Sequence, residues 1–171
     1  MLAAVIAHEL GPDNATLTVH TRRGGAAAKA GHDLELRVTS WRARLDEQSA
    51  ELTADAASLR VVKGTGGMQA LGDEDKANIH QTIDDDVLKR ADIVFRSTRV
   101  DGSRVEGDLT LGDRTQPIEF ELEPGADGTI RARAVVTQTR WGIKPFSALF
   151  GTLKVLDDVE VVLEGRPGQS R

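Results

Sequence analysis

Apolar and polar residues alternate over residues 107–122, and this alternation is the clearest structural signal in the chain. A tight Gly112-Asp113 connection divides the segment into two runs. The apolar positions that share one face are Leu109, Leu111, Ile118, Phe120 and Leu122. Alternation with a period of two is typical of an antiparallel hairpin with one face toward a core and the other toward water. We therefore expect a half-buried hairpin in this segment.

The same alternation recurs along most of the chain and predicts about eight strands. They cover residues 16–21, 33–38, 50–61, 92–100, 105–111, 117–122, 130–136 and 159–163. Trp41 breaks the parity of the second strand, which indicates a bulge near Thr39-Ser40 or a strand that changes faces there. Consecutive antiparallel strands of this kind close into a barrel or split into a sandwich. The interior of a barrel of this size is either filled by side chains or holds one small ligand, and the pattern is compatible with both.

One segment, residues 73–91, has the periodicity of a helix instead. Its apolar residues are spaced three and four apart and are Ala77, Ile79, Ile83, Val87, Leu88 and Ala91. An acidic first turn and a basic last turn, which contains Lys89 and Arg90, both suit the helix dipole. His80 and Asp84 stand one turn apart without a zinc-protease pattern, and we expect them on a solvated polar face. The chain is therefore predicted to be all-β with one inserted α-helix.

Composition limits the classes of function. The chain has 171 residues, and we expect one domain over residues 1–171 with a core at about 15–165. The absence of cysteine excludes disulfides, thiol catalysis, Cys-ligated zinc and iron–sulfur chemistry. A net charge of -5 disfavours nucleic-acid binding. No apolar run approaches the roughly 18 residues that a membrane-spanning helix needs. Residues 1–9 lack the basic region of a signal peptide, so we expect a cytoplasmic protein.

Three groups of segments carry a family resemblance. They are GHDL at 31–34 leading to Trp41, DIVFRST at 92–98 with GDLTL at 107–111 and TQPI at 115–118, and TRWGIKPF at 139–146 with VLDDV at 155–159. In this order, over about residues 17–163, they resemble the YceI-like family, which consists of lipocalin-type β-barrels that bind polyisoprenoid lipids.

The resemblance implies an eight-stranded antiparallel lipocalin-like barrel with the helix of residues 73–91 inserted. It also implies a non-enzymatic lipid-binding or transport protein whose partner is an isoprenoid, a quinone-like lipid or another long apolar chain, without a cofactor. Members of such families often associate, which suggests a homodimer. Many members carry a cleavable leader, so a chain without an evident signal peptide fits a divergent branch of the family.

The candidate ligand-binding residues follow from strand parity and from the clustering of aromatic residues. They are His32, Leu34, Leu36, Trp41, Phe95, Leu109, Phe120, Val136, Trp141, Phe146 and Phe150. The strand residues would line the interior, and Trp41 would lie near an opening. His32 would direct its polar ring to that opening or hydrogen-bond the loop backbone. The loop aromatics Trp141, Phe146 and Phe150 would either contact the ligand or plug the barrel end as ordinary core.

Two other functions remain open. A filled barrel would act as a stress-response or protein-interaction module through the acidic outer row Glu119, Glu121 and Glu123. An enzyme acting on a small apolar substrate would use His32 as an acid or base. His20 and His32 would supply only half of a structural zinc shell, and we find neither a nucleophile motif nor a paired-carboxylate site. We therefore predict no catalytic residue, no metal and no cofactor.

Overall fold

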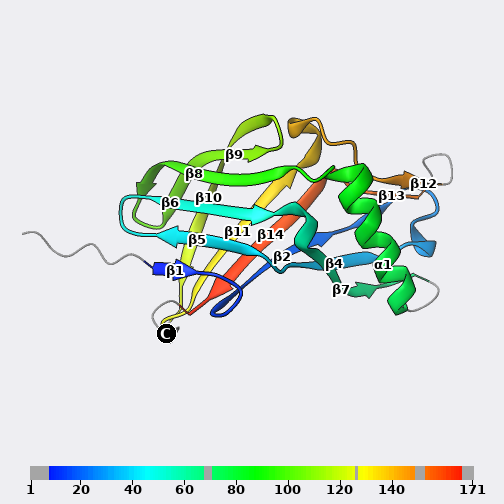
Figure 1. Ribbon diagram of the computed structural model, residues 1–171, viewed down its shortest axis with the longest axis horizontal. Helices are drawn as coiled ribbons and strands as arrows, with labels where there is room; N and C mark the ends of the chain where they lie inside the picture. Colours follow the sequence, from blue (N-terminus) through cyan, green and yellow to red (C-terminus); the bar gives the residue numbers. More distant parts are fainter. Residues whose placement is uncertain (1–7, 68–70, 126, 149–152, 167–171) are drawn as a thin grey trace, which may run out of the picture.

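An antiparallel sheet of eleven strands dominates the structure (Figure 1). The computed structural model describes residues 8–67, 71–125, 127–148 and 153–166. The strands of this large sheet are β1 (His8–Leu10), β2 (Ala15–Thr21), β4 (Asp33–Val38), β5 (Trp41–Leu45), β6 (Ala50–Asp55), β7 (Leu59–Thr65), β8 (Asp92–Asp101), β9 (Arg104–Leu111), β10 (Arg114–Pro124), β11 (Ile130–Thr137) and β14 (Asp158–Gly165). Their order in space is β1-β5-β6-β8-β9-β10-β11-β14-β2-β4-β7. The predicted all-β class with antiparallel pairing is confirmed.

A second sheet of three short strands lies at one end of the large sheet (Figure 1). It consists of β12 (Ser147–Ala148), β13 (Leu153–Val155) and β3 (Arg23–Gly24). The short helical turns of the chain are η1 (Ala28–Ala30), η2 (Ala56–Ser58) and η4 (Gln138–Trp141). We call this end of the molecule the small-sheet end. The opposite end, where the β5–β6 and β10–β11 connections lie, is called the hairpin end.

The chain itself joins the two ends of the large sheet. β4 pairs with β2 and β7, yet it continues through Thr39 and Ser40 into β5, which pairs with β1 and β6. The Thr39 amide donates to the Ser58 carbonyl and the Ser40 amide donates to Ser58 Oγ, both at 3.0 Å. On the other side of this kink, the Asp55 amide donates a hydrogen bond to the Ser40 carbonyl at 3.0 Å. The sheet is therefore curled into a half-barrel.

The predicted number of eight strands is wrong, and the kink is the main reason. The chain that was expected to form one strand over residues 50–61 is divided by η2 into β6 and β7. The parity break at Trp41 marks the corresponding division between β4 and β5. In addition, the short strand β1 precedes the first predicted strand and pairs with β5 through Leu10 and Ala43.

The helix begins as predicted and ends earlier. α1 (Asp73–Thr82) continues into a π-helical turn, η3 (Ile83–Val87). The Asp75 side chain accepts a hydrogen bond from the Gly72 amide at 3.1 Å, which caps the first turn. Lys89 and Arg90 have φ values of 52° and 55°, so the backbone leaves the right-handed helical region before Ala91. Within the described residues, no helix has the length and apolar character needed to cross a bilayer.

Buried side chains form two clusters, one on either side of the interior. The first contains Leu10, Ala15, Leu17, Leu36, Val38, Trp41, Ala43 and Leu59. The second contains Phe95, Val105, Leu109, Val136 and Trp141. In the second cluster, Gly107 gives the Phe95 ring its space, because a Cβ at this position would lie 2.5 Å from a ring carbon. The β8–β9–β10 wall is therefore closely packed around Val105, which is fully buried.

Candidate ligand-binding cavity

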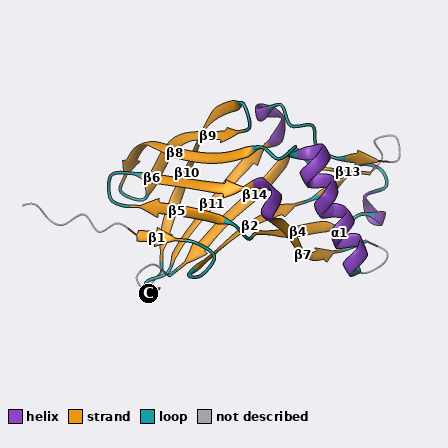
Figure 2. Ribbon diagram, viewed as in Figure 1, coloured by secondary structure: helices purple, strands orange, loops and turns teal. Residues whose placement is uncertain are grey.

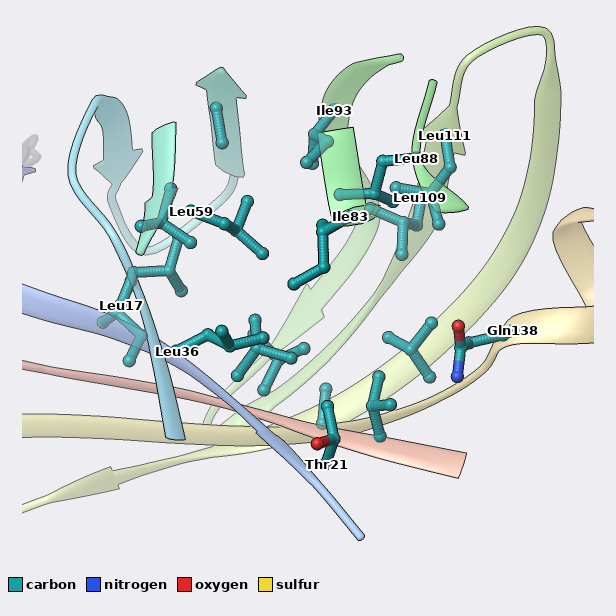
Figure 3. A pocket seen from close by; sticks show the side chains of 18 of the residues that line it. Leu17, Thr21, Leu36, Leu59, Ile83, Leu88, Ile93, Leu109, Leu111 and Gln138 are labelled. Carbon is teal, nitrogen blue, oxygen red and sulfur yellow. The ribbon is translucent and has the colours of Figure 1, made fainter. Parts of the chain in front are cut away.

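The curled sheet and helix α1 enclose a cavity of about 570 Å³ (Figure 3). Small-molecule pockets in proteins commonly have volumes of about 300–1,000 Å³. The interior is therefore hollow, and it is large enough to hold a ligand. Figure 2 shows that α1 lies across the small-sheet half of the curled sheet, where β7 forms its edge.

Alternate residues of the strands supply most of the cavity wall. The aliphatic and aromatic strand residues that line it include Leu17, Val19, Leu34, Leu36, Phe95, Leu109, Leu111, Ile118, Phe120, Val136, Val159, Val161 and Leu163. Phe95 and Phe120 contact one another with ring centroids 5.4 Å apart and planes inclined at 54°. Because successive side chains of a strand point to opposite faces, the same alternation that predicted a core face produces this apolar wall.

The helix closes the cavity with side chains that the sequence analysis did not assign to the ligand. Ile79, Ile83, Val87 and Leu88 all line it, and Figure 3 shows Ile83 and Leu88 pointing inward. None of the residues of α1 or η3 is fully buried. Ile83 and Leu88 pack against the first buried cluster on one side and border the cavity on the other, which explains this partial exposure. The spacing of three and four residues in the sequence predicts an apolar stripe, but the spacing is the same whether the stripe packs against a core or covers a cavity.

His80 anchors the helix to the edge of the sheet. The Leu59 carbonyl at the start of β7 accepts a hydrogen bond from His80 Nδ1 at 2.6 Å. Arg60 Nη1 donates to the Ala57 carbonyl at 2.7 Å beside this contact. We expected His80 on a solvated polar face, and this is corrected by the structure. β7 is an edge strand, and a backbone carbonyl at its beginning is therefore accessible to a side chain of the helix.

Two polar side chains interrupt the apolar wall near the small-sheet end. Thr21 is 9% exposed, and its hydroxyl has no hydrogen-bond partner among the described residues. Gln138 is 7% exposed, and its Nε2 donates to the Leu156 carbonyl at 3.2 Å. Both line the cavity and are drawn with it in Figure 3. Sequence reasoning missed both as ligand contacts, although Thr21 shares the inward parity of Val19 in β2, and Gln138, the first residue of η4, follows β11 two residues after the inward-facing Val136.

The two ends of the cavity differ in charge. Arg23, His32 and Lys154 border it at the small-sheet end. Arg23 is held in place there, because its Nη1 donates to the Thr65 carbonyl at 2.9 Å. Toward the hairpin end, Arg44 and Glu51 border the cavity and lie opposite one another in the β5–β6 pair, and Arg133 borders it from β11 and is ion-paired with Glu160. The small-sheet end is therefore more positive than the hairpin end.

The structure brings together most of the residues that the sequence analysis assigned to a ligand. His32, Leu34, Leu36, Phe95, Leu109, Phe120, Val136 and Phe146 line the cavity. Trp41 and Trp141 belong instead to the two buried clusters and are absent from the lining that the described residues form. Phe150 lies outside the described residues.

The loop aromatics divide between the two roles that the sequence analysis left open. Trp141 is 3% exposed and belongs to the buried wall, whereas Phe146 is 43% exposed and lines the cavity. The Arg140 guanidinium lies 5.1 Å from the centroid of the Trp141 ring and covers it from outside. Trp141 therefore acts as a plug, and Phe146 is available to a ligand.

The two histidines near the first strands do not meet. His20 Nε2 lies 3.2 Å from the Thr18 hydroxyl, and its Nδ1 lies 4.0 Å from Glu35, on the face of β2 opposite the cavity. His32, by contrast, lines the cavity. Among the described residues, no three His, Asp or Glu side chains gather in a group that could hold a metal ion.

Two shifted carboxyl groups lie in surface turns away from the cavity. The pKa of Asp46 is lowered chiefly by a hydrogen bond from the Gln48 amide. The pKa of Asp127 is lowered chiefly by a hydrogen bond from the Thr129 hydroxyl. Both carboxylates stabilise turns at the hairpin end, so their ionisation supports the fold.

Comparisons with known proteins agree with this architecture. The family model for the YceI-like domain matches residues 10–166. Among solved structures, the chain is similar to the crystal structure of BcnA from Burkholderia cenocepacia, with 16% sequence identity and a TM-score of 0.55. The alignment covers 88% of this chain and 94% of that chain. At this identity the likeness is one of fold. A comparison with curated proteins found no match.

Proposed function

Because the chain belongs to the YceI-like family over residues 10–166, we propose that it is a non-enzymatic carrier that holds an extended apolar lipid in its cavity. The ligand class is an isoprenoid or quinone-like chain. The observation that carries the proposal is the cavity of about 570 Å³, whose wall is mostly aliphatic. Burial of apolar ligand surface contributes about 25 cal/mol per Å² before the costs of ordering the ligand, so a long chain gains affinity along its whole length.

The alternative of a filled, protein-binding barrel has less support. Its contact surface was the acidic row on β10, yet Arg104 Nη2 donates to Glu119 at 2.6 Å. This contact raises the pKa of Arg104, chiefly through the hydrogen bond itself. The next two glutamates of the row lie opposite Arg133 and Arg131 in the β10–β11 pair. These two arginines are ion-paired with Glu160 and Glu164 of β14, so arginine balances part of the negative charge on this face, which weakens the case for an acidic docking surface.

The alternative of an enzyme rests on His32 alone. His32 lines the cavity, but the lining formed by the described residues contains no serine or cysteine that a histidine base could activate as a nucleophile. The remaining lining is dominated by apolar side chains. A lining of mostly apolar side chains is typical of a ligand-binding site and offers few groups for catalysis. Homodimer formation and a cytoplasmic location stay predictions.

Lipid analysis of the purified protein tests the proposal. Protein prepared without detergent is extracted with organic solvent, and the extract is examined by mass spectrometry. We expect a stoichiometric long-chain lipid from the wild type. Ala134→Trp, which fills the cavity, should remove most of it, whereas Val135→Trp on the outer face of the same strand should retain it. An empty wild-type extract, with a melting temperature that added isoprenoids and quinones do not raise, would contradict the proposal.

A further inference from the structure

Thr21 is an unusual residue for the wall of an apolar cavity. Its hydroxyl is buried and has no partner among the described residues, although the neighbouring positions on the same face, Leu17 and Val19, are aliphatic. Buried hydroxyl groups in proteins nearly always make a hydrogen bond, because the unsatisfied group loses its interaction with water. A hydroxyl that faces a cavity obtains this hydrogen bond from whatever occupies the cavity.

Gln138 offers a second polar side chain on the cavity wall at the same end of the molecule. Its amide nitrogen gives one N–H to the Leu156 carbonyl, so the acceptor Oε1 and the second N–H of the amide remain for a ligand. The backbone places Gln138 and Thr21 on either side of the same stretch of chain. The Gln138 amide donates to the Asp157 carbonyl, and the Leu156 amide donates to the Arg22 carbonyl. The two polar residues therefore lie on opposite sides of the segment 156–157, at the small-sheet end of the cavity.

The chemistry of this pair is neutral. The Thr21 hydroxyl both donates and accepts, and Gln138 Oε1 accepts. A ligand hydroxyl can donate to Gln138 Oε1 or exchange a hydrogen bond with the Thr21 hydroxyl. A charged group at the same depth would lose its hydration without a buried counter-charge, which is unfavourable. From this point toward the hairpin end the wall is apolar and includes Leu45, Ala50 and Leu52, which suits a hydrocarbon chain.

We propose that Thr21 and Gln138 form a head-group site for a hydroxyl-bearing isoprenoid. This proposal rests on the proposed lipid-binding function and adds an orientation to it. The hydroxyl end lies at the small-sheet end, where Thr21 and Gln138 supply polar partners, and the apolar chain extends toward the hairpin end. The site selects an alcohol or phenol over the hydrocarbon of the same chain.

Affinity measurements with three probes test the site. Geranylgeraniol, its parent hydrocarbon and geranylgeranyl monophosphate are titrated against the delipidated full-length protein. The variants are Thr21→Val, which keeps the shape of the side chain, and Gln138→Met. Thr16→Val, an exposed position on the same strand, is the matched control. We expect Thr21→Val to weaken geranylgeraniol binding about fivefold and to leave hydrocarbon binding unchanged, as expected for one hydrogen bond. Gln138→Met should act in the same direction.

The melting temperature of the unliganded protein supplies an independent readout. Thr21→Val should raise it, because the variant removes an unsatisfied buried hydroxyl. Equal loss of alcohol and hydrocarbon binding in Thr21→Val would overturn the head-group site while leaving the lipid-binding function standing. Tighter binding of the monophosphate than of the alcohol, sensitive to Arg23→Gln and insensitive to Thr21→Val, would overturn it in favour of an anionic head at the cavity border. A wild type that binds none of the probes would overturn both proposals.

Discussion

The indole nitrogen of Trp141 donates a hydrogen bond to the carbonyl oxygen of Leu109 at 2.8 Å. This bond joins η4 to β9 across a contact that is fully buried, since Trp141 is 3% exposed. An aromatic residue in a loop before the last strand thus belongs to the wall of the molecule and does not act as a movable cover. The distinction can be tested, because a wall residue and a ligand contact respond differently to substitution.

Trp141→Phe should lower the free energy of unfolding by about 1–3 kcal/mol, because the Leu109 carbonyl loses its buried donor. Urea denaturation measures this loss. Lipid affinity, measured well below the denaturation midpoint, should remain close to that of the wild type. Phe146→Leu is the matched comparison, since this half-exposed ring lines the cavity and its loss should reduce affinity more than stability. The opposite ranking of the two variants would show that Trp141 contacts the ligand.

Ser58→Ala should destabilise the kink that joins the ends of the sheet. Ser58 Oγ accepts from the Ser40 amide at 3.0 Å and donates to the Asp55 carbonyl at 2.7 Å. The variant removes both partly buried hydrogen bonds, each of which contributes about 0.5–1.5 kcal/mol to the free energy of unfolding. Ser49→Ala, in an exposed turn, should change stability by about 0.5 kcal/mol or less. Equal melting temperatures for the two variants would refute the role of the kink.

Truncation should cost less where a side chain faces the cavity than where it faces the packed wall. Val105→Ala removes a fully buried side chain and should cost about 2–3 kcal/mol. Ile83→Ala removes a larger one, yet it should cost only about 1 kcal/mol because Ile83 is half-buried against open space. Lipid affinity should show the reverse order. Thermal denaturation and lipid titration of both variants check the ranking, and a larger stability loss for Ile83→Ala would count against an open cavity.

His80→Ala should release the helix from β7 with little effect on the rest of the fold. The bond from His80 Nδ1 to the Leu59 carbonyl is the anchor, and its loss should cost about 1 kcal/mol. Amide hydrogen exchange should become faster within α1 and remain unchanged in β9 and β10. Gln81→Ala, an exposed neighbour on the same helix, is the control. Uniformly faster amide hydrogen exchange across the sheet would show that His80 supports the stability of the whole fold and not of the helix alone.

The inner faces of the strands were predictable because side-chain parity is a local property. Leu36, Phe95 and Leu109 were assigned to the interior from alternation, and they line the cavity. Alternation does not report whether the face it defines meets other side chains or an empty space. The choice between a filled and a hollow interior depends on how strongly the sheet curls, and that depends on distant contacts such as the bond between Thr39 and Ser58.

Departures from the predictions occur where tertiary contacts override a local pattern. Basic residues near a helix end normally continue the last turn, but Lys89 and Arg90 adopt positive φ values so that the chain can enter β8. Thr21 shares the parity of Leu17 and Val19, but this alternation gives no sign that its hydroxyl lacks a partner among the described residues. Such a feature becomes visible only when every neighbouring donor and acceptor is placed.

In a regular closed barrel, the number of strands and their stagger together set the internal radius. The division of two long strands at residues 39–40 and 56–58 removes this constraint. The width of this cavity depends on the angle between the two parts of the sheet at the kink, which a few short side chains determine. Homologues with the same strands can therefore accept ligands of different width through substitutions at this kink alone. Variants intended to change the size of the accepted ligand should be made at the kink before the cavity lining is altered.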